Sequence, residues 1–240
     1  MHWASEFYGG KSVFVVGGTS GIGLGVATAF RDAGATVFAT GATDAEVATA
    51  SSTDGIAFHR LDVRDTAMVR AVGEACGPLV ALVNCAGVNL RAAEFELDTF
   101  ETVLDINLTG AMRVATAFRD KLKGGAIVNF ASMFAFFGAP YAPAYTASKT
   151  GIAGLTRSLA HAFAKDPVRV NALAPGWIET PMTEAPRANP TRNAELVARM
   201  PLGRWGTPAD VAPAALFLCS PLASYITGAV LPVDGGYLVA

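Results

Sequence analysis

Short runs of apolar residues alternate along the chain with longer segments in which apolar residues recur every three to four positions. The short runs cover residues 12–16, 36–40, 56–61, 79–84, 126–131 and 169–173. They have the length of strands and are almost continuously apolar, which is typical of parallel strands covered by helices on both faces. We therefore predict that these runs form parallel strands.

The longer segments have helical length and spacing, and they cover residues 21–33, 65–75, 99–121, 144–164 and 208–219. Strands that alternate with helices form βαβ units, whose right-handed crossovers place helices on both faces of a sheet. The sequence thus predicts an α/β fold: a Rossmann-like, doubly wound parallel sheet with helices on both faces. No linker or repeat interrupts the pattern, so residues 1–240 are expected to form a single domain.

One segment departs from this alternation. Residues 179–204 are richer in proline, polar and charged residues, and they follow the last predicted strand. In doubly wound sheets, ligands bind at the carboxyl ends of the strands. We expect a substrate lid at about residues 177–204.

Composition and charge exclude several classes of function. The 18 basic and 20 acidic residues give a net charge of −2, without the basic excess that nucleic-acid binding requires. Cys76, Cys85 and Cys219 are far apart in the sequence and form no CxxC pair, so we expect neither a disulfide framework nor a metal site. Free cysteines are typical of the reducing cytoplasm.

Two uncharged stretches, residues 12–30 and 124–148, are long enough to cross a bilayer. The first contains five glycines, and the second contains Asn129, Ser132 and two prolines. We interpret both as buried segments rather than membrane spans. The N-terminus also lacks the basic-then-apolar order of a secretory signal, so a cytoplasmic protein without membrane contact is predicted.

A glycine-rich turn joins the first predicted strand to the first predicted helix. Gly17, Gly21 and Gly23 are spaced so that backbone N–H groups could approach a pyrophosphate at the helix N-terminus. The strict GxGxxG spacing is absent, so a tight turn with close helix packing is the alternative interpretation.

A tyrosine and a lysine share one face of a predicted helix. Tyr145 and Lys149 are four positions apart. A nearby cation favours the phenolate form of tyrosine, which a general base near neutral pH requires. A surface pair with a solvent-exposed amine is the alternative.

The order of these motifs resembles the short-chain dehydrogenase/reductase family over nearly the whole chain. The resemblance is carried by the glycine turn, Asp62-Val63, residues 84–87, Asn107, Ser132, Tyr145, Lys149, Pro175-Gly176, Thr180 and residues 234–236. It implies a dinucleotide-binding catalytic domain that transfers a hydride between a nicotinamide cofactor and a small or medium secondary alcohol or ketone. The alternatives on this fold are a non-redox, epimerase-like enzyme and a nucleotide-binding sensor.

The resemblance also implies the roles of individual residues. Tyr145 would exchange the substrate proton, Lys149 would lower the pKa of Tyr145 and bind the nicotinamide ribose, Ser132 would hold the substrate oxygen, and Asn107 would anchor a water molecule. The implied cofactor-binding set is Gly17, Thr19, Ser20, Gly21, Ile22, Gly23, Gly41, Asp62, Val63, Asn84, Ala86, Gly87, Tyr145, Lys149, Pro175, Gly176, Ile178 and Thr180. From spacing alone, a helix cap is an equally good interpretation of Asp62.

The chain departs from the family pattern in two places. Val16 stands where a threonine commonly stabilises the glycine turn, and we expect a modest structural effect. Gly41 stands where an acidic residue would bind the ribose 2′-hydroxyl, and no basic residue for a 2′-phosphate is present at Ser20 or Ala42. Thr40 and Thr43 could donate hydrogen bonds to a phosphate, so NAD(H) and NADP(H) both remain candidates, with weak discrimination between them.

The residues expected to face the nicotinamide are mostly apolar and aromatic: Asn89, Met133, Phe134, Phe136, Phe137, Tyr141, Trp177 and Met182. Such a lining suits an apolar or cyclic ketone or alcohol more than a charged sugar phosphate, although aromatic clusters are also common in cores.

The resemblance suggests a homotetramer. Ile152, Leu155, Leu159 and Phe163 add apolar surface to the helix at 144–164, and the C-terminal residues 229–233 and 237–240 are apolar. We expect neighbouring subunits to cover this helix and the tail.

Overall fold

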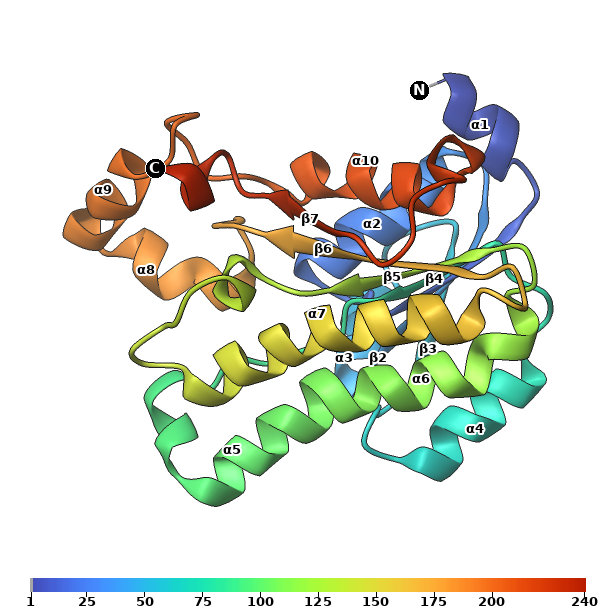
Figure 1. Ribbon diagram of the computed structural model, residues 1–240, viewed down its shortest axis with the longest axis horizontal. Helices are drawn as coiled ribbons and strands as arrows, with labels where there is room; N and C mark the ends of the chain where they lie inside the picture. The colour runs from blue at the N-terminus through green and yellow to red at the C-terminus, as the bar shows by residue number, and fades with distance from the viewer. Residues whose placement is uncertain (1) are drawn as a thin grey trace.

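A computed structural model describes residues 2–240 and contains one seven-stranded parallel sheet, shown in Figure 1. The strands are β1 Ser12–Val16, β2 Thr36–Gly41, β3 Ile56–Arg60, β4 Ala81–Asn84, β5 Ala126–Phe130, β6 Arg169–Pro175 and β7 Val230–Val233. Their order is β3-β2-β1-β4-β5-β6-β7, and every neighbouring pair is parallel. The chain therefore reverses its winding direction between β1 and β4, which is where doubly wound folds bind their ligands.

The helices are α1 His2–Tyr8, α2 Gly21–Asp32, α3 Asp44–Ala50, α4 Thr66–Ala75, α5 Leu97–Leu104, α6 Gly110–Phe118, α7 Pro143–Phe163, α8 Glu184–Ala188, α9 Pro190–Ala198 and α10 Pro208–Cys219. In Figure 1, α2 and α10 cover one face of the sheet, while α4, α6 and α7 cover the other. Each face has its own apolar core, one built with residues of α2 and α10 and one with residues of α4, α6 and α7. The predicted α/β fold with helices on both faces is confirmed.

Five of the described helices and strands were not predicted, and two of them, α8 and α9, lie in the segment expected to form the lid. The apolar run at 229–233, which we expected to be a tail covered by neighbouring subunits, forms β7 beside β6. Helices α1 and α3 lie in segments whose apolar periodicity is weak because each helix is only seven residues long. No helix in the described part of the chain is long and apolar enough to cross a membrane.

The prediction of an uncovered apolar stripe on α7 is wrong. Ile152, Leu159 and Phe163 are all at most 4% exposed, and Leu155 is partly buried. Helix α7 packs against β6 on one side and against α5 on another, as its position in Figure 1 shows. Its apolar surface is wide because it serves several neighbours within the same chain.

The long helix predicted at 99–121 is interrupted. Between α5 and α6, residues Asp105–Thr109 form a turn of π-helix, and a short 3₁₀ turn, Arg119–Lys121, follows α6. π-turns inside helices are often found at functional sites. This turn contains Asn107, which is buried.

Candidate active site

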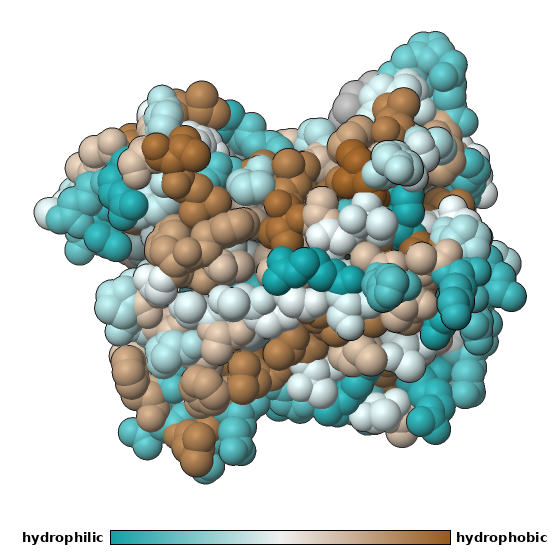
Figure 2. Space-filling model, in the orientation of Figure 1, coloured by the Kyte–Doolittle hydropathy of each residue, from teal (hydrophilic) through white to brown (hydrophobic). Residues whose placement is uncertain are grey.

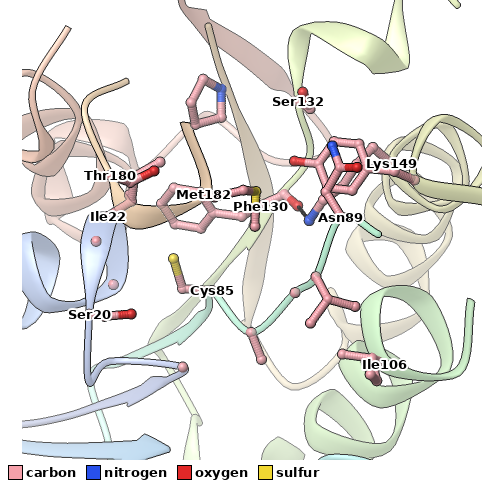
Figure 3. Close-up of a pocket in the computed structure, with 18 of the residues that line it drawn as sticks. Ser20, Ile22, Cys85, Asn89, Ile106, Phe130, Ser132, Lys149, Thr180 and Met182 are labelled. Atoms are coloured by element: carbon pink, nitrogen blue, oxygen red, sulfur yellow. Dashed lines mark hydrogen bonds between the residues drawn. The ribbon is translucent and has the colours of Figure 1, made fainter. Parts of the chain in front are cut away.

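A cavity of about 360 Å³ lies at the carboxyl ends of the strands. Sixteen of the predicted cofactor-binding residues line it: Gly17, Thr19, Ser20, Gly21, Ile22, Gly23, Asp62, Val63, Ala86, Gly87, Tyr145, Lys149, Pro175, Gly176, Ile178 and Thr180. Figure 3 shows Ser20 and Ile22 on one side of this space and Ser132 and Lys149 on another. Gly41, Asn84 and Asn107 do not line the cavity.

The glycine turn brings backbone close to backbone. Gly17 has φ +72°, and a Cβ atom there would lie 2.6 Å from the backbone nitrogen of Ala86. A Cβ atom at Gly23 would overlap the carbonyl oxygen of Gly17. The N-cap residue of α2, Ser20, makes no side-chain capping hydrogen bond, and the first turn contains no acidic residue. These features fit the pyrophosphate of a dinucleotide, which would bind the N–H groups at this helix end.

Thr40 supports the glycine turn from the neighbouring strand. Its side chain is fully buried, its Oγ1 accepts a long hydrogen bond of 3.4 Å from the Gly17 N–H, and its carbonyl accepts one of 2.8 Å from Gly18. A hydroxyl from β2 thus stands in for the one that Val16 lacks. The expectation that Thr40 could bind a phosphate is wrong, because Thr40 is enclosed in the core.

Asp62 is held by an arginine and does not cap a helix. Its carboxylate accepts hydrogen bonds from Nε (3.0 Å) and Nη2 (2.6 Å) of Arg64, and these bonds hold the pKa of Asp62 below its usual value. The cap of α4 is Asp65, which accepts a hydrogen bond from the Met68 N–H.

Tyr145 and Lys149 lie in the first part of α7, which begins at Pro143. Lys149 is 4% exposed, its Nζ donates a 2.8 Å hydrogen bond to the Phe130 carbonyl, and it lies 5.5 Å from the centre of the Tyr145 ring. Burial lowers the pKa of Lys149 to about 8. The alternative of a solvent-exposed surface pair is therefore wrong.

The pKa of Tyr145 moves in the direction opposite to our expectation. Loss of solvation raises it to about 12, which outweighs the lowering effect of a hydrogen bond with Ser132. The charges of Cys85 and Glu94 raise it further. In this environment the phenol is the favoured form, so Tyr145 is poised as a proton donor.

Behind the cavity wall, Asn107 ties the π-turn to the segment after β4. Its side chain accepts a 2.8 Å hydrogen bond from the Val88 N–H and donates bonds to the Val88 carbonyl (2.9 Å) and to Ser148 Oγ (3.1 Å). A Cβ atom at Gly87 would lie 3.3 Å from both Asn107 Oδ1 and Lys149 Nζ. Asn107 and Lys149 therefore approach each other across a position where a larger residue would push them apart.

Asn84 is placed inside the sheet. Its Nδ2 donates a 2.9 Å hydrogen bond to Oδ1 of Asn129, whose Nδ2 donates a 3.0 Å bond to Thr156 Oγ1. This buried chain links β4 through β5 to α7, and it positions the strand ends rather than the cavity surface.

The predicted substrate-facing residues are only partly brought together. Those that line the cavity are Asn89, Met133, Phe134, Tyr141, Trp177 and Met182. Phe136 is 53% exposed, and Phe137 stacks on Tyr237 outside the cavity. The sequence-based reasoning missed Glu46 and Arg91, which also line the cavity, because neither belongs to a recognisable motif.

In the described residues 2–240, no group of three or more histidine, cysteine, aspartate or glutamate side chains is arranged to hold a metal ion.

Comparison with known proteins shows that the chain is similar to dehydrogenases and reductases. A family model described as enoyl-(acyl carrier protein) reductase matches residues 16–238. The chain is 37% identical to 2-dehydro-3-deoxy-D-gluconate 5-dehydrogenase of Bacillus subtilis, over 95% of each chain, and 39% identical to galactitol 2-dehydrogenase (L-tagatose-forming) of Cereibacter sphaeroides, over 96% of each. It is similar to the crystal structure of a gluconate 5-dehydrogenase from Burkholderia cenocepacia in complex with NADP and tartrate, with a TM-score of 0.92, 29% identity and 100% of each chain covered.

Proposed function

The chain belongs to the short-chain dehydrogenase/reductase family, and from this premise we propose how its own residues carry out the reaction. It is an NAD(P)-dependent oxidoreductase that acts on an alcohol or ketone substrate. The observation that carries the assignment of roles is that Tyr145, Lys149 and Ser132 meet at one end of the cavity that begins at the glycine turn.

We propose that Tyr145 transfers the proton and that Ser132 holds the substrate oxygen. A nicotinamide cofactor, when bound, would supply the hydride that reduces the carbonyl carbon of a ketone. The Tyr145 hydroxyl gives its proton to the carbonyl oxygen, so one alcohol forms and one phenolate remains to be reprotonated. The raised pKa of Tyr145 fits this donor role, and the reverse direction uses the same groups with the proton moving to Tyr145.

Lys149 would stabilise the phenolate and bind the nicotinamide ribose, and Asn107 would anchor a water molecule that links Lys149 to solvent, so that protons can leave the site. Support comes from the buried ammonium of Lys149 and from the hydrogen bonds that fix Asn107 to Val88 and Ser148. The remaining members of the cofactor-binding set would hold the dinucleotide, with Gly17 and Gly23 leaving room for its pyrophosphate.

We propose that residues 177–204 act as a substrate lid. This segment contains a 3₁₀ turn at Pro181–Thr183 followed by α8 and α9, and Met182 lines the cavity. Nη2 of Arg91 donates a 3.2 Å hydrogen bond to the Met182 carbonyl, which links the lid to the loop after β4.

The substrate would lie between an apolar wall, which includes Phe134 and Trp177, and a polar edge formed by Asn89 and Arg91. This combination suits a short hydroxylated or carboxylated chain as well as a cyclic ketone. Relatives named for a gluconate derivative and for galactitol favour the first class.

Nicotinamide absorbance tests the proposal. The protein would be mixed with NADH or NADPH and a panel of sugar-acid ketones, keto-polyols and cyclic ketones, and the alcohols would be tested in reverse. Oxidation of the cofactor with formation of the matching alcohol is expected. Substrate isomerisation without net oxidation of the cofactor would support the epimerase-like alternative instead.

We also propose a cytoplasmic homotetramer. Because α7 is buried within its own chain, it no longer supports the tetramer. The remaining physical support is the exposed apolar surface of the edge strand β7 and of the C-terminus, where Leu231 is 37% and Val239 87% exposed. Figure 2 shows apolar side chains over the part of the surface where β7 lies. Light scattering measures the mass of the protein in solution. A stable 24.8 kDa monomer at micromolar concentration would contradict the proposed tetramer.

A further inference from the structure

A carboxylate lies at the end of β2 although the sequence position expected to carry one holds glycine. Glu46 is exposed on the first turn of α3 and lines the cavity together with Thr19 and Ser20. Its Oε2 accepts a 2.7 Å hydrogen bond from the Ala42 N–H. A Cβ atom at Gly41 would lie 3.0 Å from the same oxygen. The Glu46 carboxylate therefore reaches back from the helix and lies directly against Gly41.

The side chains at this end of the cavity that could donate a hydrogen bond to a phosphate are uncharged hydroxyls. Thr40 is enclosed in the core, and Thr43 Oγ1 caps α3 by accepting a 3.2 Å hydrogen bond from the Glu46 N–H. Ser20, drawn in Figure 3, is an uncharged side chain at the start of α2.

The nearby cations are also paired. Arg64 is bound by the carboxylate of Asp62, and Arg60 lies 3.5 Å from Asp44. Among the cavity-lining residues at this end, Glu46, Asp62 and Arg64 leave one negative charge uncompensated. A 2′-phosphate would enter a region of like charge, whereas a ribose 2′-hydroxyl would meet an acceptor.

We propose that Glu46 sets the cofactor preference of this chain by accepting a hydrogen bond from the adenosine ribose 2′-hydroxyl and repelling a 2′-phosphate. NAD(H) is then the preferred cofactor. This inference rests on the proposed dinucleotide function, and it replaces the weak discrimination that the sequence predicts. The proposed preference for NAD(H) also differs from the cofactor bound in the structural relative, which is NADP.

Binding titrations test the proposal independently of turnover. The quenching of protein fluorescence would give the Kd of NADH and of NADPH for the wild type, for Glu46→Gln and for Glu101→Gln. Gln at 46 keeps the length of the side chain and an oxygen that can accept from Ala42, while Glu101 is an exposed glutamate of α5 that does not line the cavity. The two glutamine variants thus remove the same charge at different places.

The wild type is expected to bind NADH at least about 10-fold more tightly than NADPH, which corresponds to about 1.4 kcal/mol. In Glu46→Gln the affinity for NADPH should rise about 10-fold with little change for NADH, and Glu101→Gln should behave as the wild type. The wild-type preference should also weaken as salt is added, because exposed charges are screened.

Equal affinity of the wild type for the two cofactors would overturn the role of Glu46 and leave the proposed function standing. So would a preference for NADH that Glu46→Gln retains. If neither cofactor binds the wild type, the dinucleotide function itself is wrong. If Glu46→Gln fails to fold, the ratio of the wild-type Kd values for NADPH and NADH, and the change of this ratio with salt, still test the proposal.

Discussion

The buried carboxylate of Glu94 accepts a 2.9 Å hydrogen bond from the backbone N–H of Tyr145. Its other oxygen accepts hydrogen bonds from the N–H groups of Leu90 (2.9 Å) and Arg91 (3.2 Å). Arg91 has φ +53°, a conformation that few residues other than glycine adopt. Glu94 is 1% exposed and forms no ion pair in the described part of the chain. One side chain thus fixes both the start of α7 and the loop that lines the cavity.

Glu94→Gln is expected to weaken both functions of this side chain. Whichever way the amide is oriented, its NH₂ group faces an N–H donor, and an unsatisfied buried donor costs about 1–3 kcal/mol of unfolding free energy. The loss of negative charge should also lower the pKa of Tyr145 and shift the pH dependence of kcat/KM downward. Urea unfolding and pH profiles measure the two effects.

The matched control is Glu96→Gln, which alters an exposed glutamate two residues away. Its stability and pH profile should match those of the wild type. A stability loss in Glu94→Gln with an unmoved pH profile would limit Glu94 to a structural role.

Tyr145→Phe is expected to reduce kcat by about 10²- to 10⁴-fold, because it removes the oxygen that transfers the proton. The affinity for the dinucleotide should change little, since the ring and its packing against Phe134 remain. Steady-state kinetics and cofactor titration measure the two quantities. Tyr141→Phe, which removes the hydroxyl of another tyrosine in the same cavity, serves as the control. Near-normal turnover by Tyr145→Phe would refute the proposed proton transfer.

The sequence predicts the sheet from local signals, because continuous apolar runs identify six of the seven strands. The glycine turn and the Tyr145–Lys149 spacing mark the two ends of the cavity, but each allowed a structural interpretation, and the roles of the site residues follow from the resemblance to the family. The seventh strand is only four residues long, two of which are exposed, so its pattern does not differ from that of an apolar tail.

Contacts that form only in the folded chain account for what the sequence could not predict. The hydroxyl that supports the glycine turn comes from Thr40 on a neighbouring strand, and the carboxylate beside Gly41 comes from Glu46 on the following helix. The wide apolar surface of α7 indicates that the helix is buried, but it does not indicate whether the same chain or another subunit covers it. The raised pKa of Tyr145 depends on its solvation in the folded cavity, which the presence of a lysine four residues away does not reveal.

The structure changes what an aspartate at Gly41 would do. Its Cβ would lie 2.8 Å from Thr19 Cγ2 and 3.0 Å from Glu46 Oε2, and its carboxylate would then repel that of Glu46. From the sequence alone, Gly41→Asp should shift the preference toward NAD. We now expect it chiefly to lower the melting temperature, and Gly41→Ala, which keeps the crowding without the charge, to lower it less. If Gly41→Asp melted as the wild type does, the crowding at this position would be disproved.

Burial of the Lys149 ammonium makes a pH-dependent contribution to stability. Its pKa is about 8 in the folded chain but about 10.4 when exposed, so the unfolded state binds more protons between these values. Stability contributed by Lys149 therefore increases as the pH rises through this window. Lys149→Met cannot titrate and lacks this contribution.

The difference in unfolding free energy, wild type minus Lys149→Met, should increase by about 2 kcal/mol between about pH 7 and pH 10. Comparing the two proteins at each pH cancels most of the effect of Cys219, whose buried thiol has a raised pKa and destabilises both at high pH. Cys85 lies close enough to influence Lys149, so Cys85→Ala would serve as the background for a second pair of curves. The unfolding free energies would be measured by urea unfolding at each pH. A difference between the two proteins that stays constant across this pH range would show that Lys149 keeps an ordinary pKa in the folded protein.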